Sequence, residues 1–270
     1  MKSAFASLLM VGALSLHPTR QAATDLEMHS SGATQFISYE DLLRLPQVQF
    51  TVSGDSNFPA PARLSGVSLD QLTKSLGMQA DMVVALCGDG YRSNYPAAYL
   101  AAHHPVLVLS IDGKPQKDWP KTHDGTDLGP YLISHPSFTP AFKLLSHTDE
   151  PQIPFEVVRL DFRKESEVFG AIAPHGTFAP ESPVMSGYRI AQQNCYRCHN
   201  MGDEGGQMAS IPWPILAAMA KSSPDFFAKY VRTPQAVNPN SRMAGSPGYD
   251  DQTIAALRAY FTTFAAGGKE

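Results

Sequence analysis

The sequence has few cysteines, few charged residues and no long basic run, and each shortage excludes a class of protein. Three cysteines among 270 residues are too few for the disulfide framework of a small exported domain. Charged residues make up 17% of the chain and the formal net charge is −4, so nucleic acid is not an expected partner. Hydrophobic residues make up 43%, which excludes a disordered chain. The length predicts two domains rather than one.

The first residues are typical of an export signal. Lys2 precedes an apolar stretch from Ala4 to Leu16, and the small pair Ala22-Ala23 follows a few residues later. The stretch falls short of the roughly 20 residues that span a bilayer, and no later stretch is long enough either. We therefore expect a signal peptide over residues 1–23 and a periplasmic mature protein without a membrane span. An uncleaved membrane anchor is the alternative.

Two of the cysteines belong to the most specific motif in the chain. Cys195 and Cys198 are followed directly by His199, which gives the C-x-x-C-H arrangement that attaches a c-type haem. Two thiols three positions apart can each bond one vinyl group of the same porphyrin, and the next residue then brings an imidazole to the iron. The competing interpretations are half of a zinc site, which lacks a second ligand pair, and a thioredoxin-like redox pair, which expects a βαβ context. We predict one covalently bound haem c with His199 as an axial ligand.

The sequence around this motif, from about Pro183 to Ala266, resembles a small class I cytochrome c. Gly187 and Tyr188 belong to a helix that leads to the motif, and apolar residues at helical spacing predict a last helix from Asp251 to Phe264. Members of that family pack these two helices across each other. The resemblance implies an all-α cytochrome c domain over residues 183–266.

The same resemblance implies a second axial ligand and a partner for the imidazole. Met243 lies in a Pro-rich loop just before the last helix, where class I cytochromes carry their axial methionine; for the other methionines, apolar packing is the expected role. A proline carbonyl, from Pro212 or Pro214, is expected to accept the imidazole N–H of His199. With both axial positions filled by protein, the haem iron has no open site, and we expect an electron relay rather than a catalyst.

The segment from residue 30 to residue 165 has a different pattern, with short β-branched runs between brief capped helices. Strands are expected at four places and a tight turn at Asp112-Gly113, so the segment reads as a mixed α/β domain. The stretch 166–182 is rich in proline and reads as an interdomain linker. The expected strands are Val48–Val52, Met82–Leu86, Val106–Ile111 and Phe155–Leu160.

The order of elements in this segment resembles the molybdopterin-binding domain of the sulfite oxidase type. The resemblance rests on a strand that runs through Leu86 into Cys87 and a Gly-rich turn ending at Arg92, on the stretch Leu128–Leu132, and on the strand Phe155–Leu160. In that family, a cysteine after such a strand binds molybdenum, and Cys87 is the matching position. The segment shows no cluster of Arg and Lys to hold the pterin phosphate. The other interpretation of Cys87 is a small buried hydrophobic residue at a strand end.

Two functions follow from this two-domain α+β organisation. In the first, the chain is an exported monohaem cytochrome that exchanges electrons with a redox protein, and its N-terminal domain serves for docking. In the second, it is a molybdopterin-dependent dehydrogenase that passes electrons from a molybdenum centre at Cys87 to its own haem. The sequence leaves open whether the chain is an enzyme and favours the electron carrier, because fold resemblance alone does not establish chemistry.

Overall fold

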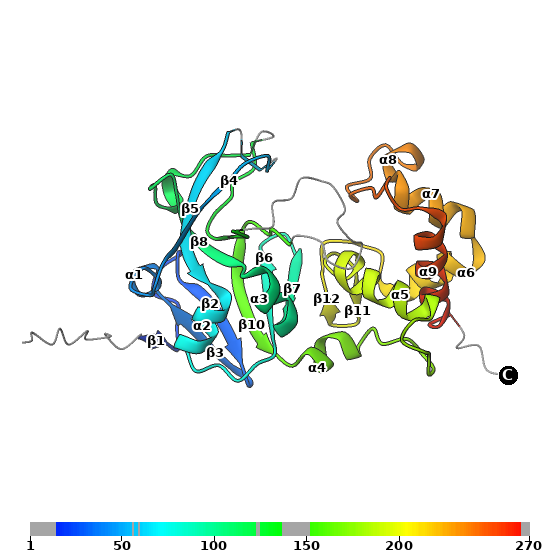
Figure 1. The fold of residues 1–270 in the computed structure, drawn as a ribbon, viewed down its shortest axis with the longest axis horizontal. Coiled ribbons are helices and arrows are strands. Elements are labelled where there is room, and N and C mark those ends of the chain that lie inside the picture. The colour runs from blue at the N-terminus through cyan, green and yellow to red at the C-terminus, as the bar shows by residue number, and fades with distance from the viewer. Residues whose placement is uncertain (1–14, 56, 59, 123–124, 137–151, 266–270) are drawn as a thin grey trace, which may run out of the picture.

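The computed structural model describes residues 15–55, 57–58, 60–122, 125–136 and 152–265. A β-rich N-terminal part and a helical C-terminal part lie side by side (Figure 1). The architecture is mixed α+β, as the sequence predicts. Within the described residues, no helix combines the length and the apolar character needed to cross a bilayer. Residues 1–14 of the expected signal peptide lie outside the described part of the chain.

Two sheets build the N-terminal part. The first has the strand order β1-β3-β2-β10-β6-β7, in which β10 pairs parallel with β2 and antiparallel with β6. Its strands are β1 (Leu16–His17), β2 (Leu26–Ser30), β3 (Ala33–Ile37), β6 (Met82–Cys87), β7 (Arg92–Pro96) and β10 (Val157–Arg163). The second sheet is antiparallel, in the order β4 (Val48–Val52), β5 (Ala62–Ser68), β8 (Val106–Ile111) and β9 (Leu132–Ser134).

All four expected strands form, two with the predicted bounds and two with different ends; β10 ends at Arg163 rather than at Leu160. β4 and β8 have the predicted bounds, and β6 is one residue longer than predicted. β10 begins at Val157 rather than at Phe155, because Glu156 has a left-handed φ of 53° that interrupts the extended backbone. Asp112 and Gly113 both have positive φ and close the predicted tight turn between Ile111 and Lys114.

Short helices cover the sheets of the N-terminal part. In α1, the side chain of Ser38 accepts a hydrogen bond from the backbone N–H of Asp41 at 3.1 Å, a capping contact that fixes where the helix begins. Leu42 of α1 and Leu69 and Leu72 of α2 are buried in the core between the two sheets. These helices are α1 (Tyr39–Leu43), α2 (Leu69–Ser75), α3 (Ala97–His103) and the 3-10 turn η1 (Gln116–Asp118).

The C-terminal part is mainly helical, but the expectation of an all-α domain is wrong in one place, because Asn200–Met201 and Glu204–Gly205 form a short antiparallel hairpin. Its first and last helices cross at Gly187, where a Cβ atom would come within 2.0 Å of the Ala256 carbonyl oxygen, so only glycine permits this approach. The last helix begins after Asp250, whose carboxylate accepts the N–H of Thr253 at 2.8 Å. The elements are α5 (Pro183–Ile190), the π-helical turn η2 (Ala191–Cys195), β11 (Asn200–Met201), β12 (Glu204–Gly205), α6 (Trp213–Ser222), α7 (Pro224–Arg232), α8 (Pro234–Val237) and α9 (Asp251–Thr262).

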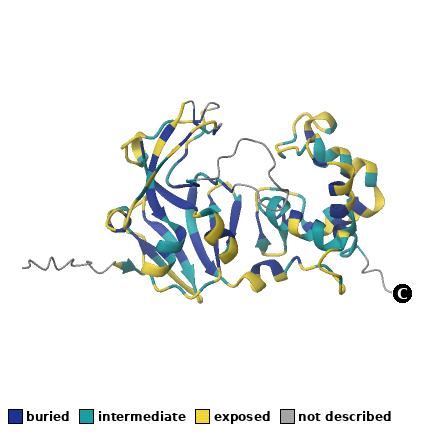
Figure 2. Cartoon of the chain, in the orientation of Figure 1, coloured by how far each residue is buried: buried dark blue, intermediate teal, exposed yellow. Residues whose placement is uncertain are grey.

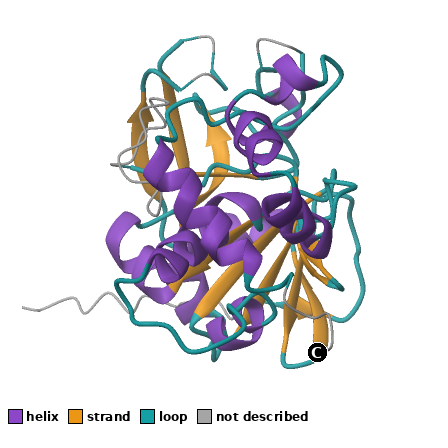
Figure 3. Cartoon of the chain, turned by 90° about the vertical axis from the view of Figure 1, so that its right-hand side faces the viewer, coloured by secondary structure: helices purple, strands orange, loops and turns teal. Residues whose placement is uncertain are grey.

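Strand β6 belongs to the cores of both parts. Successive side chains of a strand point to opposite faces. Val83 and Ala85 therefore pack into the core of the N-terminal part, while Met82 and Val84 join a second core with residues of the helical part such as Trp213. The strand is buried almost throughout (Figure 2). Seen from the side of the helical part, its helices lie in front of the first sheet (Figure 3).

The stretch 166–182 contains most of a short helix, α4 (Glu165–Gly170). Val168, Phe169 and Ile172 are buried in the second core. The hydroxyl groups of three tyrosines of the helical part donate to backbone carbonyls of these residues: Tyr196 to Val168 (3.1 Å), Tyr188 to Phe169 (2.9 Å) and Tyr260 to Ile172 (2.6 Å). This part of the expected linker is therefore packed structure.

Candidate functional site

The cysteine motif forms one compact turn. Cys195 ends η2, and its carbonyl oxygen accepts the backbone N–H groups of Cys198 (3.2 Å) and His199 (3.0 Å). Both thiols are half-buried. None of the three cysteines, all of which the structure describes, is in a disulfide. The turn thus presents two thiols and an imidazole from one short segment.

The imidazole of His199 is fixed by a single strong contact. Its side chain is buried, and Nδ1 lies 2.6 Å from the carbonyl oxygen of Ile211. A carbonyl only accepts, so Nδ1 carries the proton and donates, which leaves Nε2 with its lone pair. Burial lowers the pKa of His199, although the bond to Ile211 opposes the shift. The residue is therefore a neutral imidazole with Nε2 available to a metal.

The acceptor for His199 is Ile211, and the prediction of Pro212 or Pro214 is wrong. Pro212 is the N-cap of α6, and its carbonyl already accepts the N–H groups of Ile215 (3.0 Å) and Leu216 (3.2 Å). Pro214 lies inside the first turn of the same helix. The proline carbonyls thus accept hydrogen bonds inside the helix, and the carbonyl of Ile211, just before the helix, accepts the imidazole N–H.

Met243 lies in the loop before α9, as expected. Its carbonyl oxygen accepts from the side-chain amide of Gln235 at 2.9 Å, and its N–H donates to Ser241 Oγ at 3.3 Å. Within the described residues, these hydrogen bonds hold the backbone of Met243 to α8 and its own loop and do not reach the Cys195–His199 turn. The axial role of Met243 stays a prediction.

A second methionine, which the sequence does not single out, lies beside the motif. Met208 Sδ is 3.9 Å from Cys198 Sγ, and Met208 is 36% exposed. The residue follows the Gly-rich loop that returns to the motif, where the N–H of Ala209 donates to the carbonyl of Cys198 at 3.0 Å. In the sequence, the only sign that Met208 lies near Cys198 is that it follows this cysteine by ten residues.

Cys87 lies at the end of β6 and is only 8% exposed. Burial, chiefly, raises the pKa of its thiol far above the usual value, and the nearby charges of Asp89 and Glu156 add to the shift. Cys198 contributes in the same direction, which places the two cysteines within electrostatic reach of each other. The structure thus brings Cys87 next to the haem motif, as a protonated thiol in this arrangement.

Backbone hydrogen bonds join the turn after Cys87 to the motif. Gly90 accepts from the N–H of Gln207 at 2.7 Å, and the N–H of Arg92 donates to the carbonyl of Arg197 at 3.0 Å. Gly90 has a φ of +88°, and a Cβ there would come within 3.0 Å of the Gln207 carbonyl carbon. We call this contact between the β6–β7 turn and the motif loop the seam. Glycine at position 90 permits the close approach at the seam.

Arg92 is the best-buried cation of the seam, at 5% exposure. Its guanidinium carbon lies 4.7 Å from the centre of the Tyr196 ring, within cation–π range. Nε donates to Asn94 Oδ1 at 3.0 Å, and Nη1 lies 3.4 Å from a carboxylate oxygen of Glu204. The other oxygen of Glu204 accepts from Arg163 Nη2 at 2.8 Å. Desolvation lowers the pKa of Arg92, but an arginine stays charged.

The residues of the motif fit a haem bound through two thioether bonds. Cys195 and Cys198 supply the thiols, and His199 supplies a nitrogen with a free lone pair whose orientation is fixed by Ile211. The tight turn puts both thiols and the imidazole on one segment. Covalent haem attachment requires that arrangement, whereas a zinc site or a thioredoxin-like pair does not. We therefore keep haem as the group that this donor set suits.

The surroundings of Cys87 do not fit a molybdopterin. Its thiol is buried, and the turn that follows it is closed by the backbone of the motif loop. Arg92, which follows that turn, contacts Glu204, Asn94 and Tyr196. Among the described residues, no group of three or more His, Cys, Asp or Glu side chains is placed so that it could hold a metal ion.

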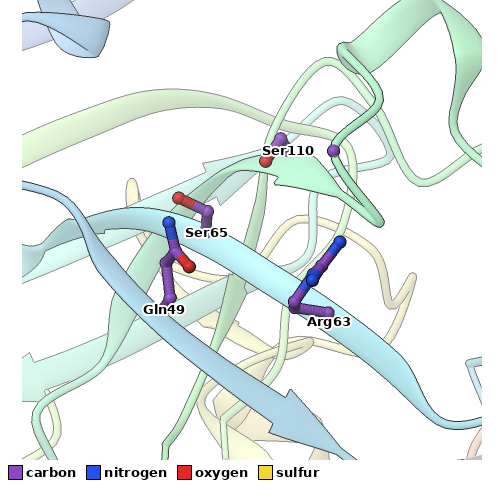
Figure 4. A pocket seen from close by; sticks show the side chains of 5 residues that line it. Gln49, Arg63, Ser65 and Ser110 are labelled. Atoms are coloured by element: carbon purple, nitrogen blue, oxygen red, sulfur yellow. The ribbon is translucent and has the colours of Figure 1, made fainter.

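Two open cavities lie away from these residues. One of about 300 Å³ lies on the second sheet, where Gln49, Arg63, Ser65 and Ser110 form a polar wall (Figure 4). Another, of about 670 Å³, lies between α4 and α5. Neither is lined by Cys87 or by the motif.

Comparison with known proteins gives distant structural likeness and no sequence match. No protein-family model and no curated protein matches the chain. One solved structure that it resembles is the sulfane dehydrogenase SoxCD from Paracoccus pantotrophus, with a TM-score of 0.35 and 13% identity. The match covers 53% of this chain and 40% of that chain, so this protein spans less than half the length of the one it matches. At this level of similarity we derive neither activity nor cofactor from the match.

Proposed function

We propose that the protein is an exported electron carrier with one covalently bound haem c. The observation that carries this proposal is the state of His199, which is buried, neutral and oriented by Ile211 within a turn that also holds two thiols. A haem with two protein ligands takes up and gives back one electron and leaves no open position for a substrate. The chain's own residues then bind and orient that group.

Each residue of the motif has a separate task in this proposal. Cys195 and Cys198 anchor the porphyrin, and His199 binds the iron from one side. The Ile211 carbonyl keeps the imidazole in one tautomer and raises its basicity as a ligand. Met243 is the proposed ligand on the other side, and its backbone is already fixed by Gln235 and Ser241.

Covalent attachment is tested directly on the purified protein. A pyridine haemochrome that remains with the protein after acid-acetone extraction is the expected result. Haem that is extracted by this treatment, or a colourless protein from a host that matures c-type cytochromes, contradicts the proposal. Mass spectrometry of the same sample locates the mature N-terminus and tests the predicted cleavage after Ala23.

The second axial ligand is tested with a pair of methionine variants. Met243→Ala is expected to abolish the red-region absorption band that sulfur-to-iron ligation produces, because no other thioether is proposed to replace it. Met208→Ala removes the other methionine near the motif and is expected to keep the band. The reverse outcome would make Met208 the ligand.

The N-terminal part is proposed to present the haem domain to a redox protein. The packed core shared through β6 and the bonds to α4 hold the two parts in a fixed relation, so a partner meets both surfaces together. Crosslinking with a candidate partner is expected to recover peptides from both parts. Crosslinks confined to the helical part would contradict this role.

The second candidate is a molybdopterin-dependent dehydrogenase of the sulfite oxidase type. The observation in its favour is the position of Cys87, whose turn bonds directly to the motif loop and would make electron transfer to the haem intramolecular. The burial of its thiol and the commitment of Arg92 weigh against it. Metal analysis separates the two candidates: molybdenum near one per chain supports the dehydrogenase, and iron alone supports the carrier.

A further inference from the structure

Three charged side chains meet at the seam. Arg92 comes from β7 and Arg163 from β10 of the first sheet, while Glu204 comes from β12, in the hairpin that follows His199. Glu204 receives both arginines, at 3.4 Å and 2.8 Å. We call these three residues the clamp. The N-terminal part supplies both cations, and the helical part supplies the anion.

The side chains of the clamp are buried or partly buried, so water screens their charges only in part. The exposed fractions of the side chains are 6% for Arg92, 28% for Glu204 and 32% for Arg163. Partly buried charges are screened less than charges in water, so their field reaches neighbouring groups. Within the clamp, two arginines face one carboxylate; Arg163 also pairs with Glu167 of α4 at 3.5 Å, and that carboxylate offsets the remaining positive unit.

The clamp is also mechanically tied to the motif. Arg92 donates its backbone N–H to Arg197, and its guanidinium lies on the ring of Tyr196. Tyr196 and Arg197 are the two residues between Cys195 and Cys198. Any group held by those cysteines therefore lies close to the clamp. Arg92 is held by four partners, Asn94 from its own part and Tyr196, Arg197 and Glu204 from the helical part, which suits a side chain with a positioning task.

We propose that the N-terminal part tunes the haem: Arg92 and Arg163, balanced by Glu204, set the reduction potential of the iron bound at His199. This inference rests on the haem of the proposed function. Ferric haem carries one more positive charge than ferrous haem. The arginines therefore disfavour the ferric form and raise the potential, and Glu204 opposes them.

The test is the midpoint potential of the haem-loaded full chain and three variants. Arg163→Gln removes a positive charge and is expected to lower the potential. Glu204→Gln removes a negative charge while keeping the shape of the side chain, and it is expected to raise the potential. The double variant removes one charge of each sign, and its potential is expected to return close to that of the wild type. Arg44→Gln, directly after α1 and outside the second core, removes a positive charge from an exposed side chain that pairs with the buried Asp41, and it is expected to leave the potential unchanged.

The opposite signs separate electrostatic tuning from loss of structure. A merely structural clamp would shift both single variants in one direction, since both loosen the seam, and the double variant would be at least as disturbed. Shifts of equal sign, or shifts no larger than that of Arg44→Gln, overturn the inference. The ultraviolet-visible spectrum of each variant reports whether the axial ligands are retained.

Failure of the inference is distinct from failure of the proposed function. If the pyridine haemochrome shows no covalent haem in the wild-type chain, the proposed function falls and the tuning role falls with it. If the haem is present and the potentials do not follow the predicted signs, the electron carrier stands and the clamp has no tuning role. Arg92→Lys, which keeps the charge at the buried position, is expected to stay closer to the wild-type potential than Arg92→Gln.

Discussion

At the scale of single residues, Gly90 sets how closely the two parts approach. It combines a left-handed φ with a neighbouring backbone at 3.0 Å from the position of a Cβ atom. Gly90→Ala is expected to destabilise the protein by about 2 to 4 kcal/mol, which adds overpacking to the cost of a left-handed alanine. Urea denaturation measures the change.

Gly54→Ala is the matched control for this change. Gly54 also has a left-handed φ, of +76°, but a Cβ atom there would meet nothing within 4 Å. Only the backbone cost of about 1 kcal/mol is expected. Equal losses of unfolding free energy in both variants would show that the backbone at the seam shifts to accept a Cβ atom at position 90 without cost.

His135 is a buried residue whose protonation opposes folding. It lies in an aromatic cluster with Tyr95, Tyr99 and His103, and its Nε2 is 3.1 Å from the Tyr99 hydroxyl. Burial, and after it the charges of His103 and Arg197, lower its pKa from 6.5 to about 3. Because the folded pKa lies below the unfolded one, the contribution to stability is complete above pH 6.5 and is lost as the pH falls from there toward 3.

The expected loss approaches about 1.4 kcal/mol for each pH unit in that window. His135→Asn is expected to flatten this part of the stability profile, measured by urea denaturation between pH 7 and pH 4 at roughly unit steps. His104→Asn replaces an exposed histidine in a left-handed conformation that asparagine tolerates, and it should leave the wild-type slope in place. If the unfolding free energy of His135→Asn falls with pH as steeply as that of the wild type, carboxylates rather than His135 cause the pH dependence.

The motif residues could be predicted from the sequence, whereas their partners could not. Cys195, Cys198 and His199 follow from spacing alone, since the chemistry requires them to be adjacent. The partners of the seam come from strands far away in the chain, and Arg92 and Glu204 are 112 positions apart. A buried guanidinium on a strand has no local signal, because its burial depends on which domain covers that face.

At the scale of elements, tyrosine hydroxyls attach α4 and the residues after it to the helical part: two bond to carbonyls of α4 and one to Ile172, just beyond its end. Tyr260→Phe removes the bond to Ile172 and also the acceptor of the Trp213 N–H at 3.2 Å, so two buried groups lose their partners. A loss of about 2 kcal/mol is expected, against about 1 kcal/mol for Tyr188→Phe, which removes one bond from a half-buried side chain. Thermal unfolding ranks the two variants; the reverse order contradicts this account.

The sequence predicted four of the ten described strands of the N-terminal part, and it did not predict the role of α4. Runs such as Val106–Ile111 favour a strand through their β-branched residues, and Ser38 gives a local cap signal. The residues of α4 read as linker because prolines follow them and the helix is short. What makes it structure is the set of tyrosine hydroxyls from α5, α9 and the motif, which no local pattern contains.

At the scale of the whole molecule, the shared strand β6 predicts that the two parts unfold together. Val83→Ala and Val84→Ala truncate buried side chains on opposite faces of this strand, one in each core. Each is expected to cost about 2 kcal/mol. Hydrogen exchange in mild denaturant, followed by mass spectrometry, should show equal loss of protection in β8 and α9 for both variants. Loss confined to β8 in Val83→Ala would show two independent units.

Strand β7 is the last strand of its sheet, yet its outward backbone groups are occupied. Arg197 accepts the N–H of Arg92, and the side chain of Gln152 binds both the N–H (2.8 Å) and the carbonyl (2.6 Å) of Asn94. An open sheet margin is a template for pairing with other chains. Here the margin is occupied by the molecule itself, so fibrillar association through β7 first requires Gln152 and the loop of the Cys195–His199 motif to detach, and resistance to aggregation becomes linked to the integrity of that loop.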